Sequence, residues 1–340
     1  MNPFTFTQAS DVDAALARLA MPGVRPIAGG TNLLDLMKEG VMHPGELVDI
    51  NGLGFDRIEQ DAGGGLRLGA LARNADTAYH PLVRERYPLL SAAILAGASP
   101  QLRNMATNGG NLLQRTRCYY FYDVGTPCNK REPGSGCPAK EGLNRLHAIL
   151  GASEHCIATH PSDMCVALRA LDAVVHVRSQ GGAREIPFAD FHRLPGERPE
   201  LDNTLETGEL VTHITLPEAG RFAAHSTYLK VRERLSYAFA LVSVAAALDL
   251  DGGKIRAARI ALGGVAHKPW RVEEAEASLE GKAPGADAFG AAADIVLRGA
   301  KGYGRNDYKL TLARNAIEQA LSTATRGTEY AKGEHRGEQQ

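Results

Sequence analysis

Several features are scarce in this chain of 340 residues, and each scarcity excludes a class of protein. Aromatic residues make up 6% of the sequence, with Trp270 as the one tryptophan, and the net charge is −1 at pH 7. A charge so close to zero excludes the basic field with which proteins attract nucleic acids or anionic membrane surfaces. No run of about 18 apolar residues is present, so we expect no transmembrane helix.

All five cysteines lie between positions 118 and 165, and the rest of the chain has none. They are too few and too localised for a secreted disulfide scaffold, so a reducing compartment and a metal or redox use of the thiols are expected. The opening residues, MNPFTFTQAS, show neither the basic nor the apolar region of a signal peptide. We therefore expect a cytoplasmic protein. The alternative is a periplasmic subunit that is exported while attached to a signal-bearing partner.

The N-terminal third alternates between strand-like and helix-like patterns. Residues 11–20 predict an amphipathic helix with Ser10 or Asp11 as its N-cap. VRPIAGG then reads as a short strand that ends in glycines, and TNLLDLMKEG as a helix that ends near Gly40. ELVDI and LRLGAL are expected strands, and PLLSAAILAGAS is an expected helix. This order of strand, glycines and helix is typical of dinucleotide sites, although it is not GxGxxG.

The middle and the C-terminal part differ in character. Residues 117–157 are rich in Cys, Tyr, Gly and Pro and show little periodicity, which is typical of a functional insertion. SDMCVALRALDAVVHV is expected to form a helix followed by a strand, and GELVTHITL another strand. From residue 221 onward, long alternating strands and two helices, in VEEAEASLEG and near YKLTLARNAIEQALSTA, predict a second, α+β domain. The last dozen residues are polar and are expected to be disordered or to dock a partner.

Two glycine turns are candidate phosphate sites. In AGGTNL, Gly29 and Gly30 would let the backbone approach a ligand closely, and the free amides of Thr31, Asn32 and Leu33 at a helix start favour phosphate. In the second turn, TNGGNLL, two glycines again stand beside polar side chains that could bond a flavin edge or a pyrophosphate. Each turn alone is equally compatible with a tight turn and a helix cap. Together they are a natural clamp for a dinucleotide.

The cysteine spacing, C-x9-C-x8-C-x18-C-x8-C, differs from the CxxC pairs of zinc ribbons. Four thiolates in an aperiodic loop could hold a 4Fe–4S cluster, and zinc is the competing metal. Disulfides or unrelated thiols remain further alternatives. Cys165 lies in a helical stretch where a small apolar residue would pack, so we expect it in the core.

Several of these segments together resemble a known family, the FAD-binding subunits of molybdenum hydroxylases, which include xanthine dehydrogenase and carbon monoxide dehydrogenase. The segments are AGGTNLLDLMK, GASPQLRNMATNGGNLLQRTRC, ATHPSDM, YLKVRERLSYAFALVSVAAAL and GGVAHKPWR. The cysteine insertion makes the chain similar to a narrower group, the FAD subunits of bacterial aldehyde oxidoreductases of the periplasmic three-subunit type. The resemblance covers roughly residues 1–325.

The resemblance implies an α+β fold. It implies an FAD-binding domain of the vanillyl-alcohol-oxidase (PCMH) type over residues 1–220, built from two α/β subdomains and carrying the insertion at about 117–157. A C-terminal domain similar to that of the carbon monoxide dehydrogenase flavoprotein would follow over residues 221–325, and a polar tail over 326–340.

The resemblance also implies which residues bind the cofactors. FAD would contact Ile27, Ala28, Gly29, Gly30, Thr31, Asn32, Leu33 and Leu34, then Thr107, Gly110 and Asn111, with Gly97 and Ser99 as weaker candidates. Ser162 and Asp163 would bond the FAD, and Lys230 would lie near the flavin's pyrimidine edge. A 4Fe–4S cluster would be held by Cys118, Cys128, Cys137 and Cys156.

Alternative roles stay open for single residues. Asp163 could be a helix N-cap, and Lys230 a surface lysine on a strand. A structural role in its loop is expected for His160. The histidines at 147, 155 and 267 are left unassigned because they have no partner at metal spacing. The aromatic run 119–122 is expected to shield the cluster, and Trp270 to pack between the domains.

The function implied by the resemblance is electron transfer inside a heterotrimeric aldehyde oxidoreductase. Substrate would react at a molybdenum cofactor on a large partner subunit. Electrons would cross 2Fe–2S clusters on a small partner subunit, reach FAD on this chain and leave to an external acceptor. No catalytic residue of its own is assigned to the chain, because the flavin supplies the chemistry. The rival hypotheses are a self-sufficient FAD-dependent oxidase of a small alcohol and a zinc-stabilised scaffold protein without redox chemistry.

Overall fold

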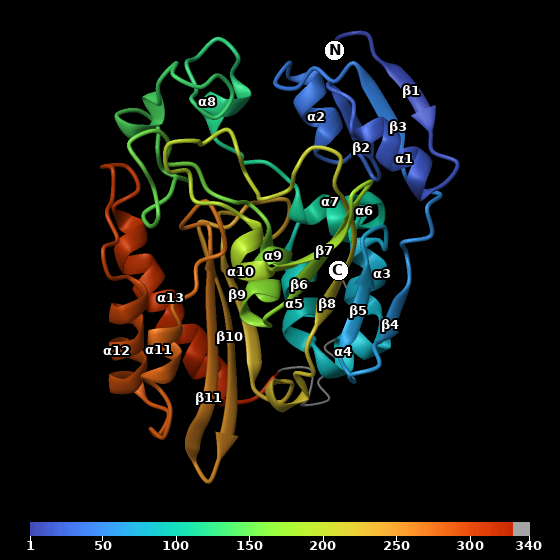
Figure 1. Cartoon of the computed structure of the whole chain (residues 1–340). Helices are drawn as coiled ribbons and strands as arrows, with labels where there is room; N and C mark the ends of the chain where they lie inside the picture. Colours follow the sequence, from blue (N-terminus) through green and yellow to red (C-terminus); the bar gives the residue numbers. More distant parts are fainter. Residues whose placement is uncertain (329–340) are drawn as a thin grey trace.

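The computed structural model describes residues 1–328 and contains three β-sheets with helices packed around them (Figure 1). The first sheet is small and parallel, in the order β1-β3-β2, with β1 at Thr5–Gln8, β2 at Val24–Ile27 and β3 at Glu46–Asp49. Helices α1 (Val12–Leu19) and α2 (Leu33–Lys38) make the connections. Asp11 caps α1 by accepting a hydrogen bond from the Ala14 amide, as its position before the apolar stripe predicts.

The second sheet is antiparallel, in the order β4-β5-β8-β6-β7. Its strands are β4 (Ile58–Gln60), β5 (Leu66–Gly69), β6 (Val174–Ser179), β7 (Gly182–Pro187) and β8 (Leu210–Leu216). The helices of this part are α3 (Asn74–Tyr79), α4 (Pro81–Arg86), α5 (Pro88–Ala96), α6 (Pro100–Met105), α7 (Asn108–Leu112), α9 (Asp163–Ala170) and α10 (Phe188–Phe191). Apolar residues of this sheet and of α5 and α9 form the largest buried core, because both helices are apolar on nearly every face.

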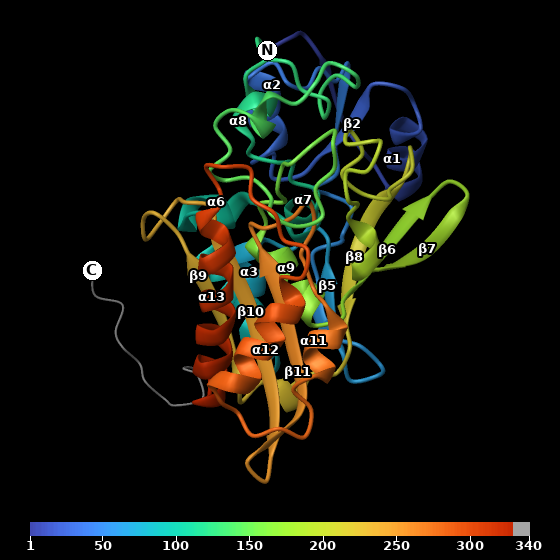
Figure 2. The same cartoon turned by 90° about the vertical axis from the view of Figure 1, so that its left-hand side faces the viewer.

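The C-terminal part is a three-stranded antiparallel sheet covered on one face by helices (Figure 2). Strands β9 (Ser226–Val231), β10 (Val242–Asp251) and β11 (Lys254–Gly263) pair in sequence order, and α11 (Glu273–Ala277), α12 (Ala286–Val296) and α13 (Tyr308–Thr325) pack against them. The sequence pattern predicts α11 and α13 but not α12, whose sequence is ADAFGAAADIV. Trp270 packs into this core and donates its indole N–H to the Val296 carbonyl at 3.2 Å.

Residues 117–157 have little regular structure, as their composition predicts. They contain only α8 (Tyr119–Tyr122) and the 3-10 turn η1 (Pro138–Lys140). Polar side chains fasten this insertion to the C-terminal part. Asn144 donates to the Tyr303 carbonyl at 2.7 Å, Asn306 to the Ala148 carbonyl at 3.0 Å, and the buried Lys309 ammonium to the His147 carbonyl at 3.0 Å.

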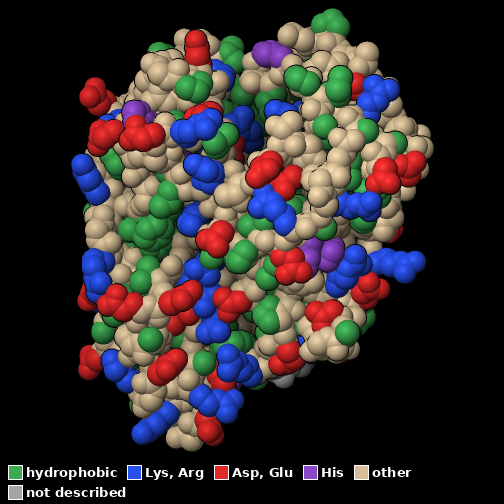
Figure 3. Space-filling view, viewed as in Figure 1, with side chains coloured by type: hydrophobic (Ala, Val, Ile, Leu, Met, Phe, Trp, Pro, Cys, Tyr) green, Lys and Arg blue, Asp and Glu red, His purple; other side chains and the backbone are tan. Residues whose placement is uncertain are grey.

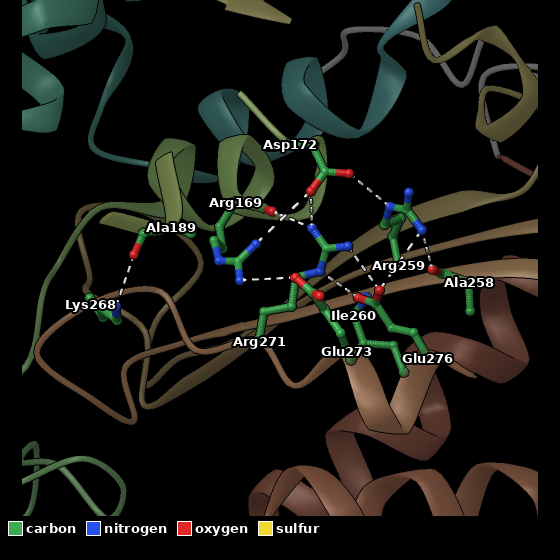
Figure 4. Close-up of polar contacts among 10 residues, drawn as sticks. All are labelled: Arg169, Asp172, Ala189, Ala258, Arg259, Ile260, Lys268, Arg271, Glu273 and Glu276. Atoms are coloured by element: carbon green, nitrogen blue, oxygen red, sulfur yellow. Dashed lines mark hydrogen bonds and ion pairs between the residues drawn. The ribbon is translucent and has the colours of Figure 1, made fainter. Parts of the chain in front are cut away.

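A network of arginines and carboxylates joins the end of α9 to the C-terminal part (Figure 4). Arg271, whose side chain is 3% exposed, lies at its centre and bonds Glu276 at 2.7 and 2.9 Å. It also bonds the Asp172 carboxylate and the Arg169 carbonyl near the end of α9. Arg259 on β11 approaches the other oxygen of Asp172 at 3.2 Å. The two parts are therefore joined by ion pairs to Asp172, whose side chain is 42% exposed, as well as by apolar packing.

These elements confirm the predicted α+β fold class. In the part of the chain that the structure describes, no helix has the length and apolar character needed to cross a membrane. Most of the polar tail predicted at 326–340 lies outside the described residues, which end at Thr328.

Candidate cofactor sites

The two glycines of the first turn are required for different reasons. Gly30 has a φ of +70°, in the left-handed region that favours glycine. Gly29 has no room for a side chain, because a Cβ there would lie 1.9 Å from the Met105 carbonyl oxygen. We predicted that a ligand approaches Gly29 closely. In the structure, the backbone at the end of α6 makes a close approach to Gly29. This contact sets the first glycine turn directly against the segment that leads into the second.

Asn32 continues the junction between the two turns. It is the N-cap of α2 and its side-chain oxygen accepts a hydrogen bond from the Arg115 amide at 2.9 Å. The buried Asn32 Nδ2 atom makes a weak polar contact with the Tyr122 hydroxyl, and no hydrogen bond of normal geometry satisfies it among residues 1–328. A buried N–H without an acceptor is costly, so this donor fits a ligand oxygen at the turn.

The second glycine turn starts α7. Thr107 caps the helix by accepting a hydrogen bond from the Gly110 amide at 3.2 Å. Gly109 is buried, and a Cβ on it would lie 3.1 Å from the Ala70 Cβ. Gly110 is exposed, and a Cβ there would meet only the Thr107 hydroxyl, at 3.0 Å. Gly110 is thus the glycine of this turn whose open face a ligand could approach.

Asn111 connects the second turn to the start of α9. Its side-chain oxygen accepts from the Ser162 hydroxyl at 2.5 Å, and its amide donates to Asn74 at 2.6 Å. Ser162 is also the N-cap of α9, accepting from the Cys165 amide at 3.0 Å. The alternative reading of Asp163 as this N-cap is therefore wrong, because Asp163 lies one residue later in the first turn.

Asp163 and Lys230 form a buried ion pair between α9 and β9. Their charged atoms lie 2.8 Å apart, with side-chain exposures of 8% and 3%, so Lys230 is not a surface lysine. Asp163 also accepts from the Tyr228 hydroxyl at 2.7 Å, and burial raises the pKa of Tyr228 well above its usual value. The Lys230 ammonium has three N–H donors, of which Asp163 and the Ala96 carbonyl at 3.0 Å take two. One donor is left for a ligand.

The turn at residues 97–99 packs beside this pair. A Cβ on Gly97 would lie 3.2 Å from the Asp163 carboxylate, and Ala98 has a φ of +52°. Ser99 caps α6 by accepting from the Leu102 amide at 3.3 Å. The two weaker candidates, Gly97 and Ser99, thus shape the backbone around Asp163.

A small cavity of about 30 Å³ lies next to these residues and is lined by Ser162 and Asp163, by Arg117, and by Phe239 of the β9–β10 loop. In the space-filling view, the surface is hollowed between the N-terminal part and the insertion, and basic side chains are visible at the hollow (Figure 3). Gly29 contacts the Met105 backbone, so the first turn lies against the segment that leads into the second turn. The arrangement therefore fits an extended ligand that follows both glycine turns.

The four cysteines predicted as metal ligands line one small cavity of about 10 Å³, together with the buried Lys130. Cys118, Cys128, Cys137 and Cys156 are all free. Burial raises the pKa of Cys118 to about 12. A hydrogen bond between Cys137 and Cys156 lowers the pKa of the Cys137 thiol to about 6 and raises that of Cys156 well above its usual value.

Cys165 lies apart from this cavity. It is fully buried in α9 among the apolar residues of the largest core, and burial raises the pKa of its thiol to about 12. Its ligand atom lies within 4.8 Å of those of His160 and His192. The His160 ring packs at 4.2 Å from that of His192, and its backbone N–H donates to the Ala266 carbonyl at 3.0 Å.

Two residues that sequence reasoning left unassigned lie against the cysteines. His147 Nε2 is 3.0 Å from Cys118 Sγ, and His267 Nε2 is 3.3 Å from Cys156 Sγ. His155 lines the same cavity but directs its Nε2 to Glu197 at 2.9 Å. No local spacing reveals these contacts, because His267 is 111 residues from Cys156 in sequence.

The aromatic run beside the cysteines is divided between the interior and the surface. Phe121 is fully buried, and both it and Tyr120 line the cysteine cavity, whereas Tyr119 is 49% exposed. The side chains of Phe121 and Tyr120 thus exclude water from the thiols. Four thiols that line one cavity behind an apolar wall suit a metal–thiolate centre, while the Lys130 ammonium in that wall is already paired with Asp202 at 2.7 Å.

Comparison with known proteins agrees with this geometry. Residues 2–219 match the family model described as the FAD binding domain in molybdopterin dehydrogenase, and residues 227–324 match the CO dehydrogenase flavoprotein C-terminal domain. The chain is 52% identical over 326 residues to the aldehyde oxidoreductase FAD-binding subunit PaoB of Escherichia coli, covering 95% of this chain and 99% of that one.

More distant relatives extend the comparison. The glyceraldehyde dehydrogenase medium chain of Sulfolobus acidocaldarius is 29% identical, and the alignment covers 82% of each chain. Among solved structures, carbon monoxide dehydrogenase from Hydrogenophaga pseudoflava superposes with a TM-score of 0.74 at 26% identity, covering 96% of this chain and 99% of that one. This protein therefore belongs to the FAD-binding subunits of the molybdenum hydroxylases, the family of carbon monoxide dehydrogenase and xanthine dehydrogenase.

Proposed function

We propose that this chain is the FAD-binding, electron-transferring subunit of a heterotrimeric molybdenum aldehyde oxidoreductase. Its partners would be a large subunit with the molybdenum cofactor and a small subunit with 2Fe–2S clusters. The relative in E. coli is named the FAD-binding subunit of an aldehyde oxidoreductase, and the two chains align over nearly their whole lengths. That similarity supports aldehydes as the substrate class of the complex. The acceptor of the electrons would be external.

The observation that carries the proposal is the junction of the two glycine turns at Gly29 and Met105. This contact brings the first turn, which carries the buried Asn32 Nδ2 atom, against the segment that leads to the open Gly110 of the second turn, and this supports a ligand that binds both turns. When bound, FAD supplies reversible two-electron chemistry at its ring. The residues of this chain bind and orient it. The turns would receive the pyrophosphate, and the remaining Lys230 donor would face the pyrimidine edge, where a cation stabilises added negative charge.

We further propose that Cys118, Cys128, Cys137 and Cys156 hold a 4Fe–4S cluster. Their shared cavity, the buried Lys130 in its wall and the separate location of Cys165 support this ligand set. Zinc held by the same four thiolates is the rival.

Flavin and metal analysis of the purified chain tests both proposals. We expect one FAD and about four irons per chain, the stoichiometry of a four-cysteine cubane. Cys128→Ala should lose the iron, whereas the matched control Cys165→Ala should keep it, because Cys165 packs in the core of α9. Zinc without flavin would contradict both proposals. Iron lost from the control but kept in the Cys128 variant would reverse the ligand assignment.

A further inference from the structure

Two buried imidazoles contact two of the four proposed cluster ligands. His147, 2% exposed, lies at 3.0 Å from Cys118 Sγ, and His267, 8% exposed, lies at 3.3 Å from Cys156 Sγ. His147 belongs to the insertion, whereas His267 follows β11 in the C-terminal part. The thiols are therefore contacted from two separate segments of the chain.

The chemistry of a bound cysteine decides the direction of these hydrogen bonds. A thiolate that ligates iron has no proton to donate, so it can only accept. Each imidazole must then carry its hydrogen on Nε2. The Nδ1 atoms of both rings have no hydrogen-bond partner among the described residues, which is the arrangement expected for a neutral ring that donates from Nε2.

The backbone around each histidine is fixed by its own contacts. The His147 amide donates to the Asn144 carbonyl at 2.9 Å, and its carbonyl accepts from the Lys309 ammonium at 3.0 Å. Beside His267, the Ala266 carbonyl accepts from the His160 amide at 3.0 Å, and Lys268 donates to the Ala189 carbonyl at 2.9 Å. The backbone at both histidines is thus held by contacts outside the cysteine cavity.

We propose that His147 and His267 are positioning residues that donate N–H···S hydrogen bonds to the cluster cysteines and so raise the reduction potential of the cluster. This inference rests on the 4Fe–4S cluster of the proposed function. Hydrogen bonds to cluster sulfurs favour the reduced form, because it carries more negative charge.

His147 has a further property that His267 lacks. His147 and Cys118 line both the cysteine cavity and the cavity lined by Ser162 and Asp163. They therefore lie between the two cavities. If the cluster and FAD bind as proposed, His147 would donate its hydrogen bond to the cluster ligand that borders both sites.

The test is an EPR-monitored redox titration of the holoenzyme, together with its iron content. His147→Phe and His267→Phe each remove a donor but keep a planar ring of similar size. We expect full iron and a shift of the cluster midpoint to lower potential in both. His155→Phe is the matched control, because His155 lines the same cavity but bonds Glu197. Its midpoint should be unchanged. His147→Gln keeps an N–H near the Nε2 position and should restore the wild-type midpoint.

An unchanged midpoint in both phenylalanine variants, with full iron, would overturn the inference. Loss of iron from His147→Phe but not from the His155 control would also overturn it, because His147 would then be needed to retain the cluster rather than to tune it. A wild-type protein without iron would instead remove the cluster itself, so failure of the proposed function is distinguished from failure of the inference.

Discussion

Gly29→Ala should separate the two glycine turns and weaken FAD binding. The new Cβ would lie 1.9 Å from the Met105 carbonyl oxygen and 2.7 Å from its carbon, and both are backbone atoms that no rotamer change can move. Contacts of a Cβ below 3.0 Å are essentially never seen, so the two segments must part by about 1.1 Å or more. Overpacking of this kind typically costs about 1–3 kcal/mol.

This cost should appear as lost affinity. The FAD-free protein can relieve the clash by letting the turns move apart, whereas an FAD that follows both turns needs them together. Since about 1.4 kcal/mol corresponds to a tenfold change, 1–3 kcal/mol weakens FAD binding about 5- to 150-fold. The assay is the dissociation constant of FAD, measured by flavin fluorescence on protein from which FAD has been removed.

Gly45→Ala is the matched control, because its Cβ would meet no atom within 4 Å. It should bind FAD like the wild type. A Gly29→Ala variant that binds FAD with unchanged affinity would refute the idea that the Gly29–Met105 contact sets the spacing of the two turns.

Two further predictions concern stability. Glu276→Gln leaves the buried Arg271 with only Asp172 as a charge partner, so we expect a loss of about 3 kcal/mol in the free energy of unfolding, the lower end for a broken buried pair. Urea unfolding measures it, and the double variant Arg271→Met with Glu276→Leu should recover much of the loss. Burial lowers the pKa of His192 from 6.5 to about 4. Between pH 4 and pH 6.5 the unfolded chain therefore binds a proton at His192 and the folded chain does not. His192 alone should therefore lower the free energy of unfolding by about 3 kcal/mol as the pH drops from 6.5 to 4, in addition to the other buried histidines whose pKa is lowered, and a melting-temperature profile of His192→Gln should be flatter in that range. A profile equal to that of the wild type would contradict this assignment.

Local pattern was sufficient for elements whose cause is local. The helix over 11–20 has a cap and an apolar stripe, and the structure places α1 at Val12–Leu19 with Asp11 as its cap. The aperiodic composition of 117–157 likewise predicted a segment without a sheet or long helix of its own. The family resemblance supplied the fold class, which periodicity alone could not, because the pairing order of strands depends on contacts far apart in sequence.

What the sequence did not reveal depends on such distant contacts. Gly29 looks like a ligand-facing glycine in its motif, but its need for glycine comes from Met105, 76 residues later. His147 and His267 have no motif, because they reach Cys118 and Cys156 only after the insertion and the C-terminal part have packed together. Lys230 resembled a surface lysine on a strand until the packing of β9 against α5 and α9 buried it beside Asp163.

The fastening of the insertion to the start of α13 has a consequence for synthesis of the chain. Asn306 and Lys309 hold the backbone at residues 147 and 148, yet they emerge about 150 residues after Cys156. At about 5–20 residues per second, the ribosome needs roughly 8–30 s to cover that distance. During this interval His147 and His267 have not yet packed against the thiols of Cys118 and Cys156. Loading of a metal centre is therefore expected to follow translation, on a chain that is almost finished, and a chain truncated before residue 306 should retain none.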